Sequence, residues 1–144
     1  MRLAREFFFI PIILLIFTFI VSDAYGFIYG KFASILFPTD SSVAQISKMY
    51  ITAVIGYMAL EYFVLSTLPN NYLFSRMLGM ISMMSLYIIF STYYDLKTIN
   101  HLFIILSGSL VSYMTQSIGE IKGQNYLGLF LLIFAFSYLT VIST

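Results

Sequence analysis

Charged residues divide the chain into long uncharged runs. No charged side chain lies between Glu6 and Asp23, and none follows Lys122. Crossing the hydrocarbon of a bilayer takes about 20 apolar helical residues, so runs of this length predict membrane spans. We expect an all-α integral membrane protein, a polytopic helix bundle in which residues 1–144 form a single membrane domain. The five predicted transmembrane helices cover residues 7–29, 46–68, 72–94, 98–118 and 126–144.

The first and last runs allow other interpretations. Arg2 and Arg5 precede an apolar stretch that ends in Ser22-Asp23-Ala24, a pattern that resembles a signal peptide with its cleavage site. We expect this segment to be retained as the first span. Residues 126–144 are just long enough to cross. Four spans plus a re-entrant or interfacial segment are therefore the alternative architecture.

Backbone chemistry favours helices over a β-barrel for these runs. Lipid offers no hydrogen-bond partners, so a spanning segment must be a helix or part of a closed barrel. Barrel strands are about ten residues long and alternate strictly, whereas these runs are longer and do not alternate. Short polar segments at 69–71, 95–97 and 120–125 predict turns between the helices.

The longest connection, residues 31–48, contains two local signals. Residues 32–37 are predicted to lie along the membrane interface as a short amphipathic piece. Ser42 followed by Gln45 fits a capping box, in which each of the two side chains accepts a hydrogen bond from the other residue's backbone N–H. We therefore expect the second long helix to begin at this point.

Composition indicates lipid as the main solvent of the surface. The chain is 60% hydrophobic and 9% charged, whereas soluble domains carry about 25% charged residues. A net charge of +1 argues against nucleic-acid binding, which needs clustered Lys and Arg. Without cysteine there are no disulfides, thiolates or Cys-ligated metals, and without tryptophan the 12 tyrosines must serve at the interfaces.

The distribution of Lys and Arg predicts the orientation. A cytoplasmic N-terminus would place Arg2, Arg5, Arg76 and Lys122 inside, and Lys31, Lys48 and Lys97 outside. Cytoplasmic loops carry the excess of positive charge. The count of four against three therefore favours a cytoplasmic N-terminus, and we expect a multi-pass protein of a prokaryotic cell membrane.

Two full charges interrupt the apolar run from 58 to 80. Glu61 lies inside the predicted second span, roughly 10 Å from its end at 1.5 Å per residue, and Arg76 lies early in the third. A tight turn would bring both to a similar depth, and a lone charge there is costly. We expect Glu61 and Arg76 to form an intramembrane ion pair that holds the two helices in register. The alternative is that Glu61 is a proton or cation site.

Small residues at helical spacing predict helix–helix contacts, since they let backbones approach closely. The candidate packing positions are Gly26, Gly30, Gly56, Gly79, Gly108 and Ser112. Gly26 and Gly30 form a GxxxG pattern at the end of the first span, where loop flexibility is the alternative. For the hydroxyl residues, the alternative is a hydrophilic path for a ligand.

His101 is the single histidine and the one candidate metal ligand of note. A zinc site needs three or four ligands, and the chain has neither cysteine nor a second histidine. We therefore expect no metal and no cofactor. Haem held by His101 and one of eight methionines, or a site shared with a partner chain, are the alternatives. No GxSxG, HExxH or P-loop is present, so we expect no enzyme activity beyond that of a subunit in an enzyme complex.

Residues 37–64 contain a pattern seen elsewhere. Pro38, Ser42 and Lys48 match the signature Pro-x-Asn-Glu-Ser-x-Trp-Glu-His-x-Lys, with Asp40 in place of Asn and Gln45 in place of Glu. The Trp and His positions of that signature are Ala44 and Ile46 in this chain. The stretch thus resembles a family of small multi-span prokaryotic membrane proteins. That resemblance implies a helical membrane protein and assigns no activity.

These features favour a non-catalytic accessory subunit of a larger integral-membrane complex of the respiratory, photosynthetic or monooxygenase type. Its small-residue faces would brace the helices of partner subunits within the lipid bilayer. The alternative is a small transporter or ligand-binding membrane module. In that case Glu61, Tyr57, Tyr87 and Gln116 would form a polar pocket, with Glu61 as an intramembrane proton or cation site.

Overall fold

The computed structural model describes residues 2–24, 30–64, 68, 70–93, 98–119 and 122–143. Every regular element in these ranges is a helix, so the predicted all-helical fold is confirmed there. The elements are α1 (Arg2–Ala24), α2 (Lys31–Leu36), α3 (Val43–Val64), α4 (Tyr72–Tyr93), α5 (Thr98–Ser117) and α6 (Gln124–Ile142). Three of them, α3, α4 and α6, are long and apolar enough to cross a membrane, and α1 carries a shorter apolar helix, Ile10–Val21.

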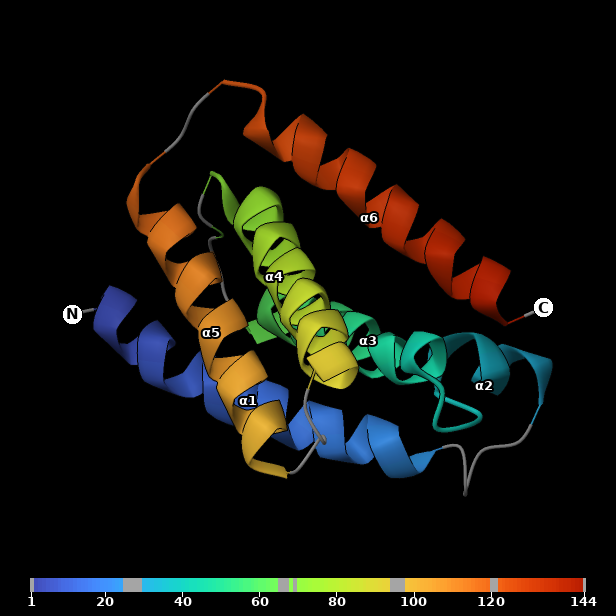
Figure 1. Cartoon of the computed structure of the whole chain (residues 1–144). Coiled ribbons are helices and arrows are strands. Elements are labelled where there is room, and N and C mark those ends of the chain that lie inside the picture. Colours follow the sequence, from blue (N-terminus) through green and yellow to red (C-terminus); the bar gives the residue numbers. More distant parts are fainter. Residues whose placement is uncertain are drawn as a thin grey trace.

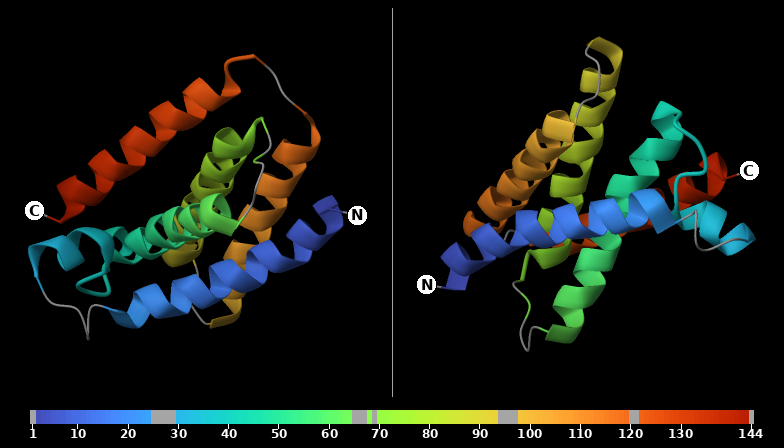
Figure 2. Two further views of the ribbon diagram at one scale, coloured as in Figure 1. Left: turned by 180° about the vertical axis from the view of Figure 1, so that it is seen from behind. Right: turned by 90° about the horizontal axis from the view of Figure 1, so that it is seen from below.

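The helices form a bundle with α4 near its centre. α4 packs against α3 on one side and against α5 on the other. α1 contacts α3 and α5, and α6 contacts α4 and α3. α1 and α6 therefore lie on opposite sides of the bundle (Figures 1 and 2). Seen from below, α1 crosses α3 instead of running alongside it (Figure 2). The buried core lies where these helices meet, around Tyr50, Met77, Ile104 and Leu139.

Glycines bring two pairs of helices into close contact. A Cβ atom on Gly79 would lie 2.8 Å from the carbonyl oxygen of Gly108, so α4 and α5 touch through their backbones. A Cβ atom on Gly128 would lie 2.6 Å from the backbone nitrogen of Phe74, where α6 crosses α4. Gly128 was not among the predicted packing positions, although it is a lone glycine in an apolar run.

The other predicted packing glycines differ from one another. Gly56 lies at the contact of α3 with α1, where an added Cβ would meet the Phe17 ring at 3.0 Å. Gly30 precedes α2 with φ +129°, and no described residue lies within 4 Å of an added Cβ. That backbone region suits glycine, which favours the conformational alternative, and the packing role of Gly30 stays a prediction. Gly26 lies outside the described residues.

The start of α3 forms only half of the expected capping box. Ser42 Oγ accepts a hydrogen bond from the Gln45 backbone N–H at 3.3 Å, as predicted. The Ser42 N–H, however, donates to Asp40 Oδ1 at 2.8 Å. The Gln45 side chain instead accepts from the Thr39 N–H through Oε1 at 3.4 Å, and its Nε2 donates to the Ile142 carbonyl at 3.1 Å. Gln45 thus keeps a local bond and also links the start of α3 to the end of α6.

Asn71 joins the start of α4 to the end of α5. Its backbone carbonyl accepts from the Ser75 N–H at 3.0 Å, in the first turn of α4. Its buried side chain donates from Nδ2 to the carbonyls of Thr115 at 2.9 Å and Gly119 at 3.2 Å. The terminal carbonyls of a helix have no hydrogen-bond donor within that helix. Asn71 provides such a donor to the end of α5, and it does so from a segment that the sequence identified only as a turn.

Replacing Asn71 by alanine is expected to reduce the free energy of unfolding by about 1–3 kcal/mol, because two carbonyls at the end of α5 lose the donor that joins them to α4. The measurement is thermal or denaturant unfolding in lipid nanodiscs. Ser117→Ala is the matched control at the same end of α5, since that exposed hydroxyl donates only to the nearby Met114 carbonyl. Equal effects of the two variants would contradict the linking role of Asn71.

Candidate functional site

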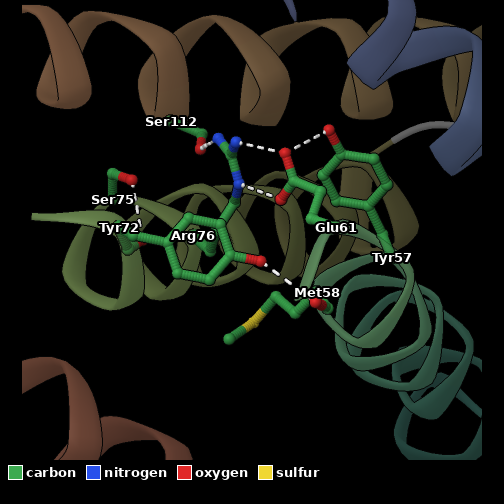
Figure 3. Close-up of polar contacts among 7 residues, drawn as sticks. All are labelled: Tyr57, Met58, Glu61, Tyr72, Ser75, Arg76 and Ser112. Atoms are coloured by element: carbon green, nitrogen blue, oxygen red, sulfur yellow. Dashed lines mark hydrogen bonds and ion pairs between the residues drawn. The ribbon is translucent and has the colours of Figure 1, made fainter. Parts of the chain in front are cut away.

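Glu61 and Arg76 form a buried, two-point ion pair between α3 and α4. Arg76 Nε donates to Glu61 Oε2 at 2.8 Å, and Arg76 Nη2 donates to Glu61 Oε1 at 2.7 Å (Figure 3). Only 5% of Glu61 and 3% of Arg76 is exposed. Parallel N–H···O bonds of this kind combine charge and geometry and are among the strongest polar contacts in proteins.

Neighbouring polar groups complete the pair. Tyr57, one turn earlier on α3, donates its hydroxyl to Glu61 Oε1 at 2.6 Å. Arg76 Nη1 donates to Ser112 Oγ on α5 at 2.7 Å. The Arg76 guanidinium also lies 5.5 Å from the centre of the Tyr57 ring and 5.3 Å from that of Tyr72, distances at which an aromatic face attracts a cation. The cluster therefore connects three helices, α3, α4 and α5.

The bonding leaves the carboxylate little capacity for chemistry. Glu61 accepts from three donors, two on Arg76 and one on Tyr57 (Figure 3). A proton or cation bound at the remaining lone pair of Oε2 would weaken the attraction to the buried Arg76, and an unpaired charge in such a place is costly. The geometry therefore favours a structural role for the pair over a transport site.

A second polar layer repeats the first on the same three helices. Tyr50 of α3, Tyr87 of α4 and His101 of α5 lie together, with ring centres 5.5 Å apart for the tyrosines and 6.2 and 6.3 Å from each tyrosine to the imidazole. The Tyr50 hydroxyl is 2.6 Å from His101 Nδ1. Each helix contributes to both layers at positions eleven apart: 50 and 61, 76 and 87, 101 and 112. Eleven residues are about three helical turns, or roughly 16 Å.

Apolar side chains fill the space between the two layers. Val54, Met80, Met83 and Ile105 are all buried at intermediate positions of the same helices. The predicted polar pocket of Tyr57, Glu61, Tyr87 and Gln116 is therefore divided, because Tyr57 and Glu61 belong to the first layer and Tyr87 to the second. Gln116 is partly buried near the end of α5.

Lys48 is a buried cation that the sequence did not single out. None of its surface is exposed, and its Nζ donates to the Ser34 carbonyl at 2.8 Å and to Ser143 Oγ at 2.9 Å. These acceptors lie at the C-terminal ends of α2 and α6, where helix carbonyls carry negative partial charge. No carboxylate in the described ranges forms an ion pair with Lys48, although Asp40 is near enough to interact with it electrostatically. The ends of α2 and α6 thus supply its direct contacts.

Replacing Lys48 by methionine is expected to loosen α2 and the end of α6 while the middle of the bundle stays folded. The free energy of local opening should fall by about 1.5–3 kcal/mol, the range for hydrogen bonds to a charged group. Hydrogen exchange followed by mass spectrometry measures this at residues 31–36 and 139–143. Lys122→Met is the exposed control, and uniform loss of protection across α3–α5 would contradict the prediction.

The structure also places the predicted metal ligand and the predicted packing residues. Among the described residues, no group of three or more His, Asp or Glu side chains could hold a metal ion. His101 is partly exposed and bonded to Tyr50. Gly79, Gly108 and Ser112 meet at the contact of α4 with α5, where a Cβ on Gly79 would be 2.9 Å from Ser112 Cβ. The packing residues thus lie beside the ion pair.

A scan against models of protein families, a search of the curated proteins and a search of the solved structures each returned no match. The class of protein is therefore defined by the fold and by the cluster around Glu61 and Arg76. The chain is a helix bundle with three helices that could cross a membrane, and its α3, α4 and α5 are joined by a buried Glu–Arg pair.

Proposed function

We propose that the chain is a non-catalytic accessory subunit of a larger integral-membrane complex of the respiratory, photosynthetic or monooxygenase type. Its role is to brace the helices of partner subunits. One observation carries the proposal. The only ion pair among the described residues is sealed inside the bundle and fully used in joining helices, while large apolar faces point outward.

The outward face of α6 is the best candidate for contact with a partner. In its most apolar stretch, only 17% of α6 is buried within the chain, compared with 44% for the same stretch of α3 and 39% for that of α4. One side of the helix carries an exposed row of large side chains, which we name the outer stripe of α6: Tyr126, Phe130, Ile133, Phe134 and Val141. Aromatic residues are enriched where protein surfaces associate, and they contribute large contact areas.

The proposed setting is a prokaryotic cell membrane, with five spans and the N-terminus in the cytoplasm. α1 and α5 would join α3, α4 and α6 as spans, the partners covering the less apolar parts of α5. Tyr62 at the end of α3 and Tyr93 at the end of α4 are both well exposed. Because α3 and α4 are consecutive helices joined by a short connection, these tyrosines lie at opposite ends of the pair, as expected for side chains at the two membrane interfaces.

The test is native purification of the tagged chain in mild detergent, followed by mass spectrometry. Larger membrane subunits should co-purify in fixed stoichiometry. A Phe130→Ala/Phe134→Ala variant should lose them without a lower unfolding temperature, because both side chains are exposed in the chain alone. Leu106→Ala/Leu110→Ala, on the exposed face of α5, is the control. Recovery of a stable, monodisperse monomer without partners would overturn the proposal.

A ligand-binding membrane module is the second candidate, and a pocket near the second polar layer favours it. The pocket has a volume of about 440 Å³ and is lined by residues that include His101 and Asp40. None of Tyr57, Glu61, Tyr87 and Gln116 lines it. A ligand would thus be recognised away from the ion pair, and a ligand-dependent rise in the unfolding temperature of the isolated chain would support this function.

A further inference from the structure

The pocket joins apolar helix faces to a polar segment. Leu15 of α1, Ile46 and Met49 of α3 and Ile105 of α5 supply part of its apolar wall. Residues 38–41, the exposed connection before α3, and His101 supply polar groups. Small-molecule sites typically have volumes of roughly 300–1,000 Å³, mostly apolar walls and a few placed polar groups. This pocket has the features of such a site for an amphipathic molecule.

Tyr50 fixes the hydrogen-bonding state of His101. Its hydroxyl is fully buried, and the structure gives that hydroxyl one partner among the described residues, His101 Nδ1 at 2.6 Å. A buried hydroxyl that only accepted would leave its own proton without a partner, which is costly. Tyr50 therefore donates to Nδ1, and the imidazole proton resides on Nε2. With Nδ1 occupied, Nε2–H is the donor that His101 can offer to the pocket.

Asp40 disfavours one class of polar head group. Its carboxylate lines the pocket and accepts from the Ser42 N–H. Hydrogen bonds from Ser42 hold the pKa of Asp40 below its usual value, so this carboxylate is charged at neutral pH. A second anion beside it would be repelled, but Asp40 is exposed and interacts electrostatically with Lys48, so this repulsion is modest. Carboxylate or phosphate heads are thus modestly disfavoured, whereas an uncharged oxygen acceptor avoids this repulsion and can accept from His101.

We propose that this pocket binds a neutral amphipathic molecule, whose hydroxyl or carbonyl oxygen accepts a hydrogen bond from His101 Nε2–H and whose aliphatic part lies against α1, α3 and α5. Such a head group occurs on free long-chain alcohols and ketones and on uncharged glycerolipids. The inference extends the second candidate function. It requires no partner chain, so the accessory role can fail or hold independently of it.

The single histidine makes a direct test possible. The full chain is prepared in phosphatidylcholine nanodiscs with isotope-labelled histidine, and the imidazole nitrogens are followed by NMR. Before any addition, the spectrum should show a protonated Nε2 and an unprotonated Nδ1. Saturating 1-decanol should shift the Nε2–H signal. Decanoate should bind about tenfold or more weakly, the factor that modest repulsion by Asp40 would give.

A matched pair of variants separates the pocket from the bilayer. Leu102 lines the pocket, whereas Leu106, one turn later on α5, is exposed and does not. Leu102→Trp should fill the pocket and abolish the response to 1-decanol, while Leu106→Trp should retain it. Diacylglycerol added to the nanodisc tests the lipid source. A response to diacylglycerol or to 1-decanol supports the site. The ligand that binds more tightly indicates whether the natural ligand is a membrane lipid or a free alcohol.

Three results would overturn the proposal. The first is a proton on Nδ1, which would make His101 an acceptor towards the pocket. The second is an equal response to 1-decanol in both tryptophan variants, which would indicate a general effect on the bilayer. The third is decylamine binding at least as tightly as 1-decanol, which would mean that Asp40 recognises a cation. In each case the co-purification test of the accessory role would be unaffected.

Discussion

Replacing Glu61 by glutamine is expected to lower the free energy of unfolding by about 3–5 kcal/mol, because it leaves a buried arginine without its counter-ion. Arg76 donates three hydrogen bonds, two of them to Glu61. A glutamine amide offers one acceptor and adds N–H groups that face the guanidinium. Reversible unfolding in nanodiscs or mixed micelles measures the loss, and Lys122→Gln, a change at an exposed lysine, is the control.

The double variant Glu61→Leu/Arg76→Met distinguishes a structural pair from a functional one. Removing both charges together is often neutral or stabilising when the replacements pack well. Most of the lost stability should therefore return, less about 1 kcal/mol each for the orphaned Tyr57 and Ser112 hydroxyls. If Glu61 were instead a proton site, Glu61→Gln would abolish a measurable proton flux while leaving the fold intact. That outcome would contradict the structural role.

Adding a methyl group at Gly79 is expected to destabilise the contact between α4 and α5. The new Cβ would lie 2.8 Å from the Gly108 carbonyl oxygen and 2.9 Å from Ser112 Cβ. Overpacking of this kind costs about 1–3 kcal/mol, which should exceed the gain of up to about 1 kcal/mol from replacing a helical glycine by alanine. Moving α5 away would also lengthen the 2.7 Å bond from Arg76 to Ser112.

A companion substitution at Gly108 tests the geometry of this contact. A Cβ there would collide with Met83 Cγ and lie 2.8 Å from the Gly79 carbonyl oxygen. Met83→Ala should therefore cost less stability in the Gly108→Ala background than in the unaltered chain, while showing no such coupling with Gly79→Ala, whose obstacles are backbone and Ser112. Ser85→Ala, at an exposed position of α4, serves as the control. Unfolding temperatures that rise in either glycine variant would contradict the close contact.

The Glu61–Arg76 contact shows how far one-dimensional reasoning can reach. The two charges lie fifteen residues apart, on either side of a short polar turn. That spacing leaves antiparallel helices as the compact arrangement, and the cost of a lone charge in an apolar setting favours pairing. The sequence could not predict that a third helix, α5, takes part in this cluster. Ser112 reaches Arg76 from a segment 36 residues further along the chain, and no local pattern encodes that distance.

The second polar layer and the role of Lys48 lay beyond sequence reasoning for a related reason. Tyr50 and His101 are 51 residues apart, and Lys48 and Ser143 are 95 apart. Whether such residues meet depends on how helices rotate and cross, which is set by packing of the whole bundle. Gly30 illustrates the converse. Its GxxxG spacing satisfied a local rule, but the positive φ of Gly30 departs from the helical geometry on which that rule depends.

The sequence by itself determined the secondary structure class and the apolar exterior, because helical periodicity, run length and the scarcity of charge act locally along the chain. It also determined that Glu61 and Arg76 needed partners. Only the tertiary structure decided which groups those partners are, that α4 packs between α3 and α5, and that a pocket forms beside His101. These features depend on the relative placement of distant helices, and that placement follows from the summed packing of many side chains.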